Sequence, residues 1–93
     1  MEFEWDPAKA KANLLKHKVP FPIACEVFKD GNRLEHPDAS GDYGEERWIV
    51  LGCVEQKVLS VVFTQRGLRI RLISARRATH NEQRIYWTGE IPS

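Results

Sequence analysis

The chain of 93 residues has few cysteines, no long apolar run and no excess of charge of one sign. Its two cysteines, Cys25 and Cys53, are too few for a disulfide scaffold or a zinc site, so we expect free thiols. Its apolar runs fall far short of the roughly 20 residues that a membrane helix needs. The acidic N-terminus lacks the basic residues and the apolar stretch of a signal peptide. These features predict a cytoplasmic protein.

The sequence also lacks the motifs that bind phosphate or metal ions. It contains no glycine-rich phosphate loop, no paired His and Cys residues at metal-ligand spacing, and no Ser, His and Asp in the order typical of hydrolases. It offers no carboxylate cluster for Mg²⁺. We therefore expect no metal ion and no cofactor, and any catalysis would use Arg, Lys, His, Glu and Tyr side chains.

The composition indicates one ordinary globular domain over residues 1–93, with 42% hydrophobic and 29% charged residues. A chain of this length buries about 60–65% of its unfolded surface, which allows one modest core and no deep cofactor cavity. Residues 88–93 match no helix or strand pattern, and we expect them to form a frayed tail.

The formal net charge of +1 hides an uneven distribution along the chain. Residues 24–46 contain seven acids and two basic residues, whereas residues 64–87 contain one acid, Glu82, and six arginines: Arg66, Arg69, Arg71, Arg76, Arg77 and Arg84. Arginine favours planar, bidentate binding of phosphate or carboxylate. The segment therefore suggests a local anionic partner, and a solvated basic face is the alternative interpretation.

The hydrophobic pattern predicts an α+β domain in the order β-α-α-(β)-β-β-β-α, with the helices packed on one face of an antiparallel sheet. Asp6 and Pro7 are typical of a helix start, and Thr79 and Glu82 form a capping-box pattern. We expect strands over 3–5, 47–54, 58–65 and 68–75, an edge strand near Leu34, and helices over 8–17, 22–28 and 80–87.

The last predicted strand carries two arginines on one of its faces. Leu68, Ile70 and Leu72 should lie against the helices, while Arg69 and Arg71 point the other way, about 7 Å apart and able to meet successive phosphates. They could equally pair with neighbouring carboxylates.

Two adjacent arginines, Arg76 and Arg77, follow at the end of this strand and should point in opposite directions. The one that faces inward needs an anion, because an unpaired buried charge is costly. Glu82 or Glu46 could supply that anion.

The final predicted helix places Glu82 and Tyr86 four residues apart on one face. Glu82 is either a helix cap or a general base beside the arginines, and Tyr86 could donate a hydrogen bond or stack on a base. His17 ends the first helix, where it serves as a cap or as a catalytic histidine. Such a set suits transesterification of RNA by its own 2′-hydroxyl group.

Ordered motifs over residues 2–86 resemble the BrnT family of type II toxins. They comprise Phe3-Glu4-Trp5-Asp6 leading to Asn13-Leu14-Leu15-Lys16-His17, then Gly44-Glu45-Glu46-Arg47 with Gly52, and then the run from Val61 to Gly67 continuing through Arg69 to Thr79, with Glu82 and Tyr86. Lys18 departs from the pattern, because a glycine commonly follows the histidine in the family, and so do Pro20 and Pro22 in the second helix.

This resemblance implies a RelE-like α+β fold and a ribonuclease that inhibits translation. It also implies a BrnA-like antitoxin, which would neutralise the toxin by contact and carry a ribbon-helix-helix part that binds operator DNA. In RelE-like toxins RNA lies on the sheet face opposite the helices. Our candidate catalytic residues are Arg66, Arg76, Glu82, Tyr86 and His17, and our candidate RNA-binding residues are Lys9, Lys16, Arg69, Arg71 and Arg77.

Two other functions are compatible with the same residues. A non-catalytic binding module would use the arginine-rich face to dock nucleic acid or an acidic protein. A degenerate toxin would survive only as a partner protein, although every motif position from Ser74 to Tyr86 is intact.

Overall fold

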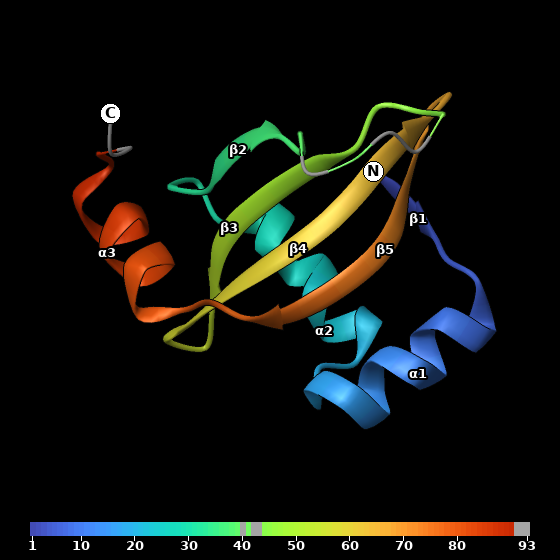
Figure 1. Ribbon diagram of the computed structural model, residues 1–93, viewed down its shortest axis with the longest axis horizontal. Helices are drawn as coiled ribbons and strands as arrows, with labels where there is room; N and C mark the ends of the chain where they lie inside the picture. The colour runs from blue at the N-terminus through green and yellow to red at the C-terminus, as the bar shows by residue number, and fades with distance from the viewer. Residues whose placement is uncertain (40, 42–43, 91–93) are drawn as a thin grey trace.

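The computed structural model describes residues 1–39, 41 and 44–90 of the chain (Figure 1). Its elements follow in the order β1 (Glu2–Glu4), α1 (Pro7–His17), α2 (Phe21–Ala24), the 3-10 helix η1 (Cys25–Lys29), β2 (Leu34–Pro37), β3 (Trp48–Val54), β4 (Lys57–Arg66), β5 (Arg69–Arg77) and α3 (His80–Thr88). The predicted α+β class and element order are confirmed, including the edge strand at Leu34.

The five strands form one sheet in the order β1-β5-β4-β3-β2. The predicted antiparallel meander of β3, β4 and β5 is confirmed, and β2 adds to it antiparallel. The sheet is nevertheless mixed, because β1 pairs parallel to β5, with Phe3 opposite Ile70. Because β1 runs parallel to β5, its last residue, Glu4, lies opposite Arg71. Helix α1 follows β1 and lies along the second half of β5, which β1 does not pair with.

The main core lies between the sheet and α1, α2 and η1. Phe21, Val27 and Val50 are fully buried there. The Phe28 ring joins the first strand to the meander, since its centroid lies 5.3 Å from that of Phe3 and 5.1 Å from that of Phe63. We call this side of the sheet the helix-covered face and the other side the open face.

Among the helices of the described residues, α1, α2 and η1 lie on the helix-covered face. Helix α3 lies apart from them beyond the end of β5 (Figure 1), where Tyr86 packs on Leu51 and Val58. Leu51 alternates with the core residue Val50, so α3 meets the open face at one end of the sheet. This placement has a local cause, because Ala78 still bonds to the Val58 carbonyl and Thr79 then starts the helix at once.

A register shift at Val62 and Phe63 decides which side chains of β5 face the helices. Ile73 has no cross-strand partner, so Leu72 and Ala75 both lie on the helix-covered face. The prediction that Leu68 lies there is wrong, because Leu68 belongs to the turn before β5 and is 91% exposed.

The chain end beyond α3 is described only through residue 90. Thr88 belongs to α3, and Gly89 caps it in the left-handed conformation by donating its N–H to the Ile85 carbonyl. Residues 91–93 of the predicted frayed tail lie outside the described residues, and the frayed tail stays a prediction there.

The side chain of Asn13 replaces a neighbouring strand at the edge of β5. Strand β1 pairs only with residues 69–71 of β5. Further along, the buried Asn13 amide accepts a hydrogen bond from the Ala75 N–H at 3.0 Å and donates to the Ala75 carbonyl at 2.9 Å. It also donates to the Val19 carbonyl at 3.0 Å, which fixes the chain after α1.

We expect Asn13→Ala to lower the free energy of unfolding by about 2–4 kcal/mol, because three backbone groups lose their partner inside the protein. Urea denaturation followed by circular dichroism measures this loss. Asn32→Ala, in an exposed loop, is the matched control and should cost little. Similar losses for both variants would contradict the role of Asn13.

Gly52 allows η1 to approach β3 closely. A Cβ at this position would lie 2.7 Å from the Val27 Cβ and 3.1 Å from the Val27 carbonyl oxygen. We expect Gly52→Ala to lower the free energy of unfolding by about 1–3 kcal/mol through overpacking. Gly31→Ala is the control, because a Cβ there meets nothing within 4 Å, and both variants are compared by thermal unfolding.

Candidate active site

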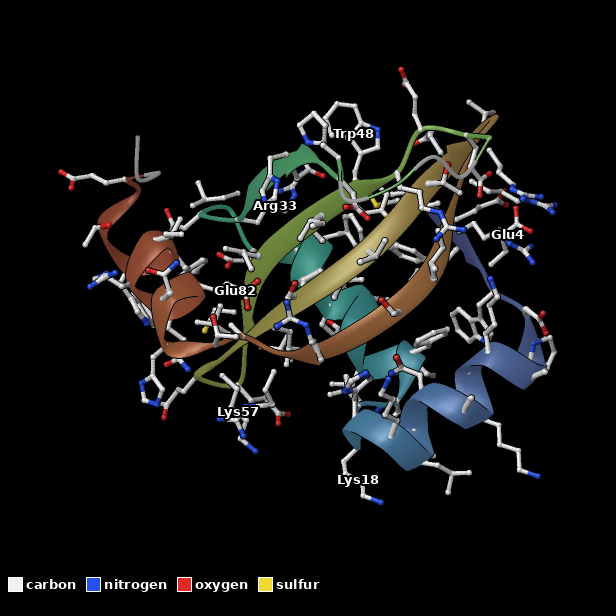
Figure 2. All side chains as sticks on the ribbon, in the orientation of Figure 1. Glu4, Lys18, Arg33, Trp48, Lys57 and Glu82 are labelled. Atoms are coloured by element: carbon white, nitrogen blue, oxygen red, sulfur yellow. The ribbon has the colours of Figure 1, made fainter. Side chains whose placement is uncertain are left out.

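Arg76 and Glu82 form a two-point ion pair where β5 ends and α3 begins. The Arg76 guanidinium donates from Nη1 to Glu82 Oε1 at 2.7 Å and from Nη2 to Glu82 Oε2 at 3.0 Å. A third hydrogen bond runs from Nη1 to the Arg77 carbonyl at 3.2 Å. Figure 2 shows Glu82 between α3 and the sheet. Of the two carboxylates considered for this arginine, Glu82 rather than Glu46 is the partner.

The capping box fixes the Glu82 side chain from the other direction. The Thr79 hydroxyl accepts a hydrogen bond from the Glu82 N–H at 3.1 Å, and Glu82 Oε1 accepts one from the Thr79 N–H at 2.8 Å. The predicted cap is therefore confirmed, and the same carboxylate also holds Arg76. The alternative interpretation of Glu82, a general base beside the arginines, stays a prediction.

The pKa of Glu82 reflects two opposing effects. Burial raises the pKa of the carboxyl group, but hydrogen bonds from Arg76 and the Thr79 N–H outweigh burial and leave it lowered. The hydrogen bond to Glu82 correspondingly raises the pKa of Arg76. The Glu82 carboxylate is charged at neutral pH, and the hydrogen bonds from Arg76 account for part of the lowering of its pKa.

Tyr86 lies on the same face of α3 as Glu82, but its hydroxyl group bonds to Asp30 and not to Arg76. The side chain is 7% exposed, and its hydroxyl donates to Asp30 Oδ2. Burial, reinforced by the Asp30 carboxylate, raises the pKa of Tyr86. The phenol thus joins α3 to the chain after η1, and its predicted catalytic role stays a prediction.

Asp30 is the residue that sequence reasoning missed. Its carboxylate accepts hydrogen bonds from Tyr86, from the Cys53 N–H at 2.8 Å and from the Asn32 N–H at 2.9 Å. Burial raises its pKa, but these bonds, with Arg33 nearby, leave it lowered. The sequence marks Asp30 as the start of a turn, and only the bond to Asn32 belongs to that local pattern.

The other arginines of the open face already hold carboxylates. Strand β1 supplies two of them, since Arg69 lies 3.5 Å from a Glu2 oxygen and Arg71 lies 3.0 Å from a Glu4 oxygen. The prediction that Arg69 and Arg71 share the open face agrees with the strand register. The guanidinium of Arg66 lies 3.5 Å from a carboxylate oxygen of Glu45.

The remaining predicted residues gather at α1 and the edge of β5. Lys9, Lys16 and His17 line a cavity of about 240 Å³ together with Ile73 and Ser74. Arg77 points to the helix-covered face and lines another cavity with His17. The structure thus places Arg76, Glu82 and Tyr86 together at the end of β5, Arg66 and Arg69 on the open face at its start, and Lys9, Lys16 and Arg77 around His17.

A family model described as the ribonuclease toxin BrnT of type II toxin-antitoxin systems matches residues 5–82. The chain belongs to the BrnT family. No curated protein matches it in a sequence search.

The BrnT match covers α1, the meander and both members of the Arg76–Glu82 pair, whereas Tyr86 lies beyond its end. A member of this family is a ribonuclease toxin, which acts on RNA and has an antitoxin partner. Among the described residues, the helices are all too short or too polar to cross a membrane.

We expect Tyr86→Phe to lower the free energy of unfolding at pH 7 by about 1–2 kcal/mol, because Asp30 loses a hydrogen bond to its charged form. The lowered pKa of Asp30 means that its contribution is complete above the unfolded pKa of about 4 and is lost as the pH falls through the folded pKa. The variant should therefore lose less stability than the wild type between pH 7 and pH 3.

Urea denaturation at several pH values checks this expectation. Asp30→Asn provides the control background, in which Tyr86→Phe should no longer change the pH dependence. An unchanged acid sensitivity of Tyr86→Phe in the wild-type background would contradict the pairing of Tyr86 with Asp30.

Proposed function

We propose that this BrnT-family chain cuts RNA endonucleolytically without a metal ion, at a site formed by Arg76 and Glu82 on the open face. The observation that carries the proposal is the two-point ion pair between Arg76 and Glu82. The pair is open to solvent, since the Arg76 side chain is 40% exposed and the Glu82 side chain is 21% exposed. The pair combines an anion-binding group with a carboxylate that can take a proton.

Arg76 has donors left for a phosphate group. A guanidinium carries five N–H groups, of which two face Glu82 and one faces the Arg77 carbonyl among the described residues. The remaining N–H groups can bind a phosphate oxygen and stabilise the charge that develops on phosphorus during the attack.

Glu82 becomes a better base when RNA draws Arg76 away. In the free protein the bonds from Arg76 keep the Glu82 pKa low, against the effect of burial. A phosphate that engages Arg76 weakens those bonds, so burial then raises the pKa toward the range in which a carboxylate accepts a proton efficiently. Substrate binding itself would therefore activate the base.

The reaction follows from these two roles. Glu82 takes the proton of the 2′-hydroxyl group, and the 2′-oxygen attacks the adjacent phosphorus. The bond from phosphorus to the 5′-oxygen breaks, which yields a 2′,3′-cyclic phosphate and a 5′-hydroxyl end. His17 stays our candidate for the acid that protonates the leaving oxygen, which requires the RNA to pass around the edge of β5 to the group that His17 forms with Arg77. Tyr86 stays our candidate for positioning.

Arg66, one of our candidate catalytic residues, lies opposite Arg69 at the start of β5 and away from Arg76, so we assign it, with Arg69 and Arg71, to binding phosphates further along the RNA. Exposed ion pairs contribute only about 0–1 kcal/mol each, so RNA can replace the Glu45 and Glu2 carboxylates at little cost. Lys9, Lys16 and Arg77 would extend the contact past the edge of β5. We further propose that a BrnA-like antitoxin with a ribbon-helix-helix part neutralises the protein and connects it to operator DNA.

The test is to incubate the purified protein with total RNA in EDTA. We expect cleavage by the wild type, and about a 100-fold or larger loss for Arg76→Ala and for Glu82→Gln, each shown to be folded by circular dichroism. Glutamine preserves the capping box, so a loss in Glu82→Gln would reflect chemistry rather than folding.

Arg84→Ala is the matched control, because Arg84 lies on the same helix, is exposed and bonds to Asn81 in its own turn. Its cleavage rate should equal that of the wild type. RNA binding without cleavage, with or without translating ribosomes, would reject the nuclease and support the non-catalytic binding module.

A further inference from the structure

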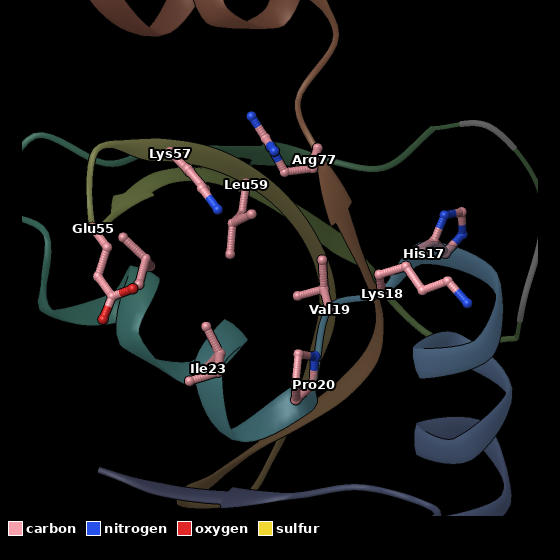
Figure 3. A pocket seen from close by; sticks show the side chains of 10 residues that line it. His17, Lys18, Val19, Pro20, Ile23, Glu55, Lys57, Leu59 and Arg77 are labelled. Atoms are coloured by element: carbon pink, nitrogen blue, oxygen red, sulfur yellow. The ribbon is translucent and has the colours of Figure 1, made fainter.

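A separate cavity of about 280 Å³ lies at the other side of the β5 end, between the end of α1, the start of α2 and the β3–β4 turn (Figure 3). Its floor is aliphatic. Val19 and Leu59 are 6% and 4% exposed, and Pro20 and Ile23 complete the apolar surface, with Ile23 44% exposed. An aliphatic side chain of a ligand would be shielded from water there.

The rim of the cavity is basic. Lys18, Lys57 and Arg77 surround the aliphatic floor together with His17, and Glu55 is the one acid among the described lining residues. Figure 3 shows Lys57 and Arg77 on one side of the floor and Lys18 on another. A ligand that fits must therefore place negative charges around an apolar centre.

Two rim residues have a left-handed backbone conformation. Three described residues other than glycine have positive φ angles, and two of them, Lys18 at 62° and Glu55 at 49°, line the cavity. Lys18 occupies the left-handed C-cap of α1, a position that glycine fills with less strain. A lysine there keeps a charge at the rim despite a backbone cost, which is typical of functional positions.

We propose that this cavity binds an acidic peptide segment that inserts one aliphatic side chain between its basic rim residues. The described lining holds no Phe, Tyr or Trp, and its floor is aliphatic, which favours an aliphatic side chain over a stacked RNA base. Within the proposed function, the source of the segment is the antitoxin, and the contact lies on the face opposite Arg76 and Glu82.

The experiment titrates the ¹⁵N-labelled full chain at low salt with a synthetic acetylated Glu-Asp-Leu-Glu-Asp amide. We expect amide resonances around Val19, Ile23 and Val54 to shift, and a peptide with Ser in place of Leu to bind about tenfold more weakly. Lys57→Glu turns an attraction into a repulsion and should raise the dissociation constant about tenfold.

Lys18→Gly is the second variant. It removes a rim charge while relieving the left-handed backbone, so it should weaken binding severalfold without lowering the melting temperature. Lys11→Glu, an exposed lysine on α1 that lines neither cavity around His17, is the matched control and should bind like the wild type.

Each outcome decides between the proposals. No peptide-induced shift at low salt, or equal binding of the Leu and Ser peptides, overturns this inference. The inference is also overturned if a 2′-O-methyl RNA oligonucleotide shifts the same resonances and Lys57→Glu abolishes RNA cleavage. Cleavage without peptide binding leaves the nuclease proposal standing alone, whereas peptide binding without cleavage rejects only the nuclease.

Discussion

The hydrogen bonds between the Asn13 amide and Ala75 are the contact on which the arrangement of both basic regions depends. Strand β1 is too short to cover β5 to its end, so the open edge would leave polar backbone groups unpaired. Asn13 satisfies one N–H and one carbonyl there and also holds the Val19 carbonyl. The end of α1 and the end of β5 are thereby kept side by side, which places His17 near Arg77.

The two neighbouring arginines at the end of β5, Arg76 and Arg77, point to opposite faces of the sheet. Residues that alternate along a strand point to opposite sides, and the unpaired Ile73 decides which arginine points where. Arg76 reaches Glu82 on the open face, while Arg77 joins the cavity on the helix-covered face. The end of β5 therefore contributes to both proposed sites, the RNA site through Arg76 and the peptide site through Arg77, and His17 and Arg77 are candidates for contacts in both.

The sequence predicts what depends on local patterns and misses what depends on long-range contacts. The helix start at Asp6, the capping box of Thr79 and Glu82, and the meander follow from short motifs and alternation, and all are present. The bond between Asp30 and Tyr86 joins residues 56 positions apart, and no local spacing announces it. The position of α3 on the open face depends on that bond and on packing, so it could not be read from periodicity.

The arginines that are concentrated in residues 64–87 form ion pairs with carboxylates from several parts of the chain. Acidic side chains neutralise the arginines of the open face: Glu2 and Glu4 on β1, Glu45 after β2, and Glu82 on α3. These carboxylates stabilise the free protein only slightly where the pairs are exposed, and a phosphate can take their place. In the proposed reaction the same exchange at Glu82 would change the chemistry, because a half-buried carboxylate that loses the hydrogen bonds of its arginine becomes a stronger base. Carboxylate pairing thus neutralises the open face locally in the free protein and, in the proposed mechanism, would make the base strongest when RNA is bound.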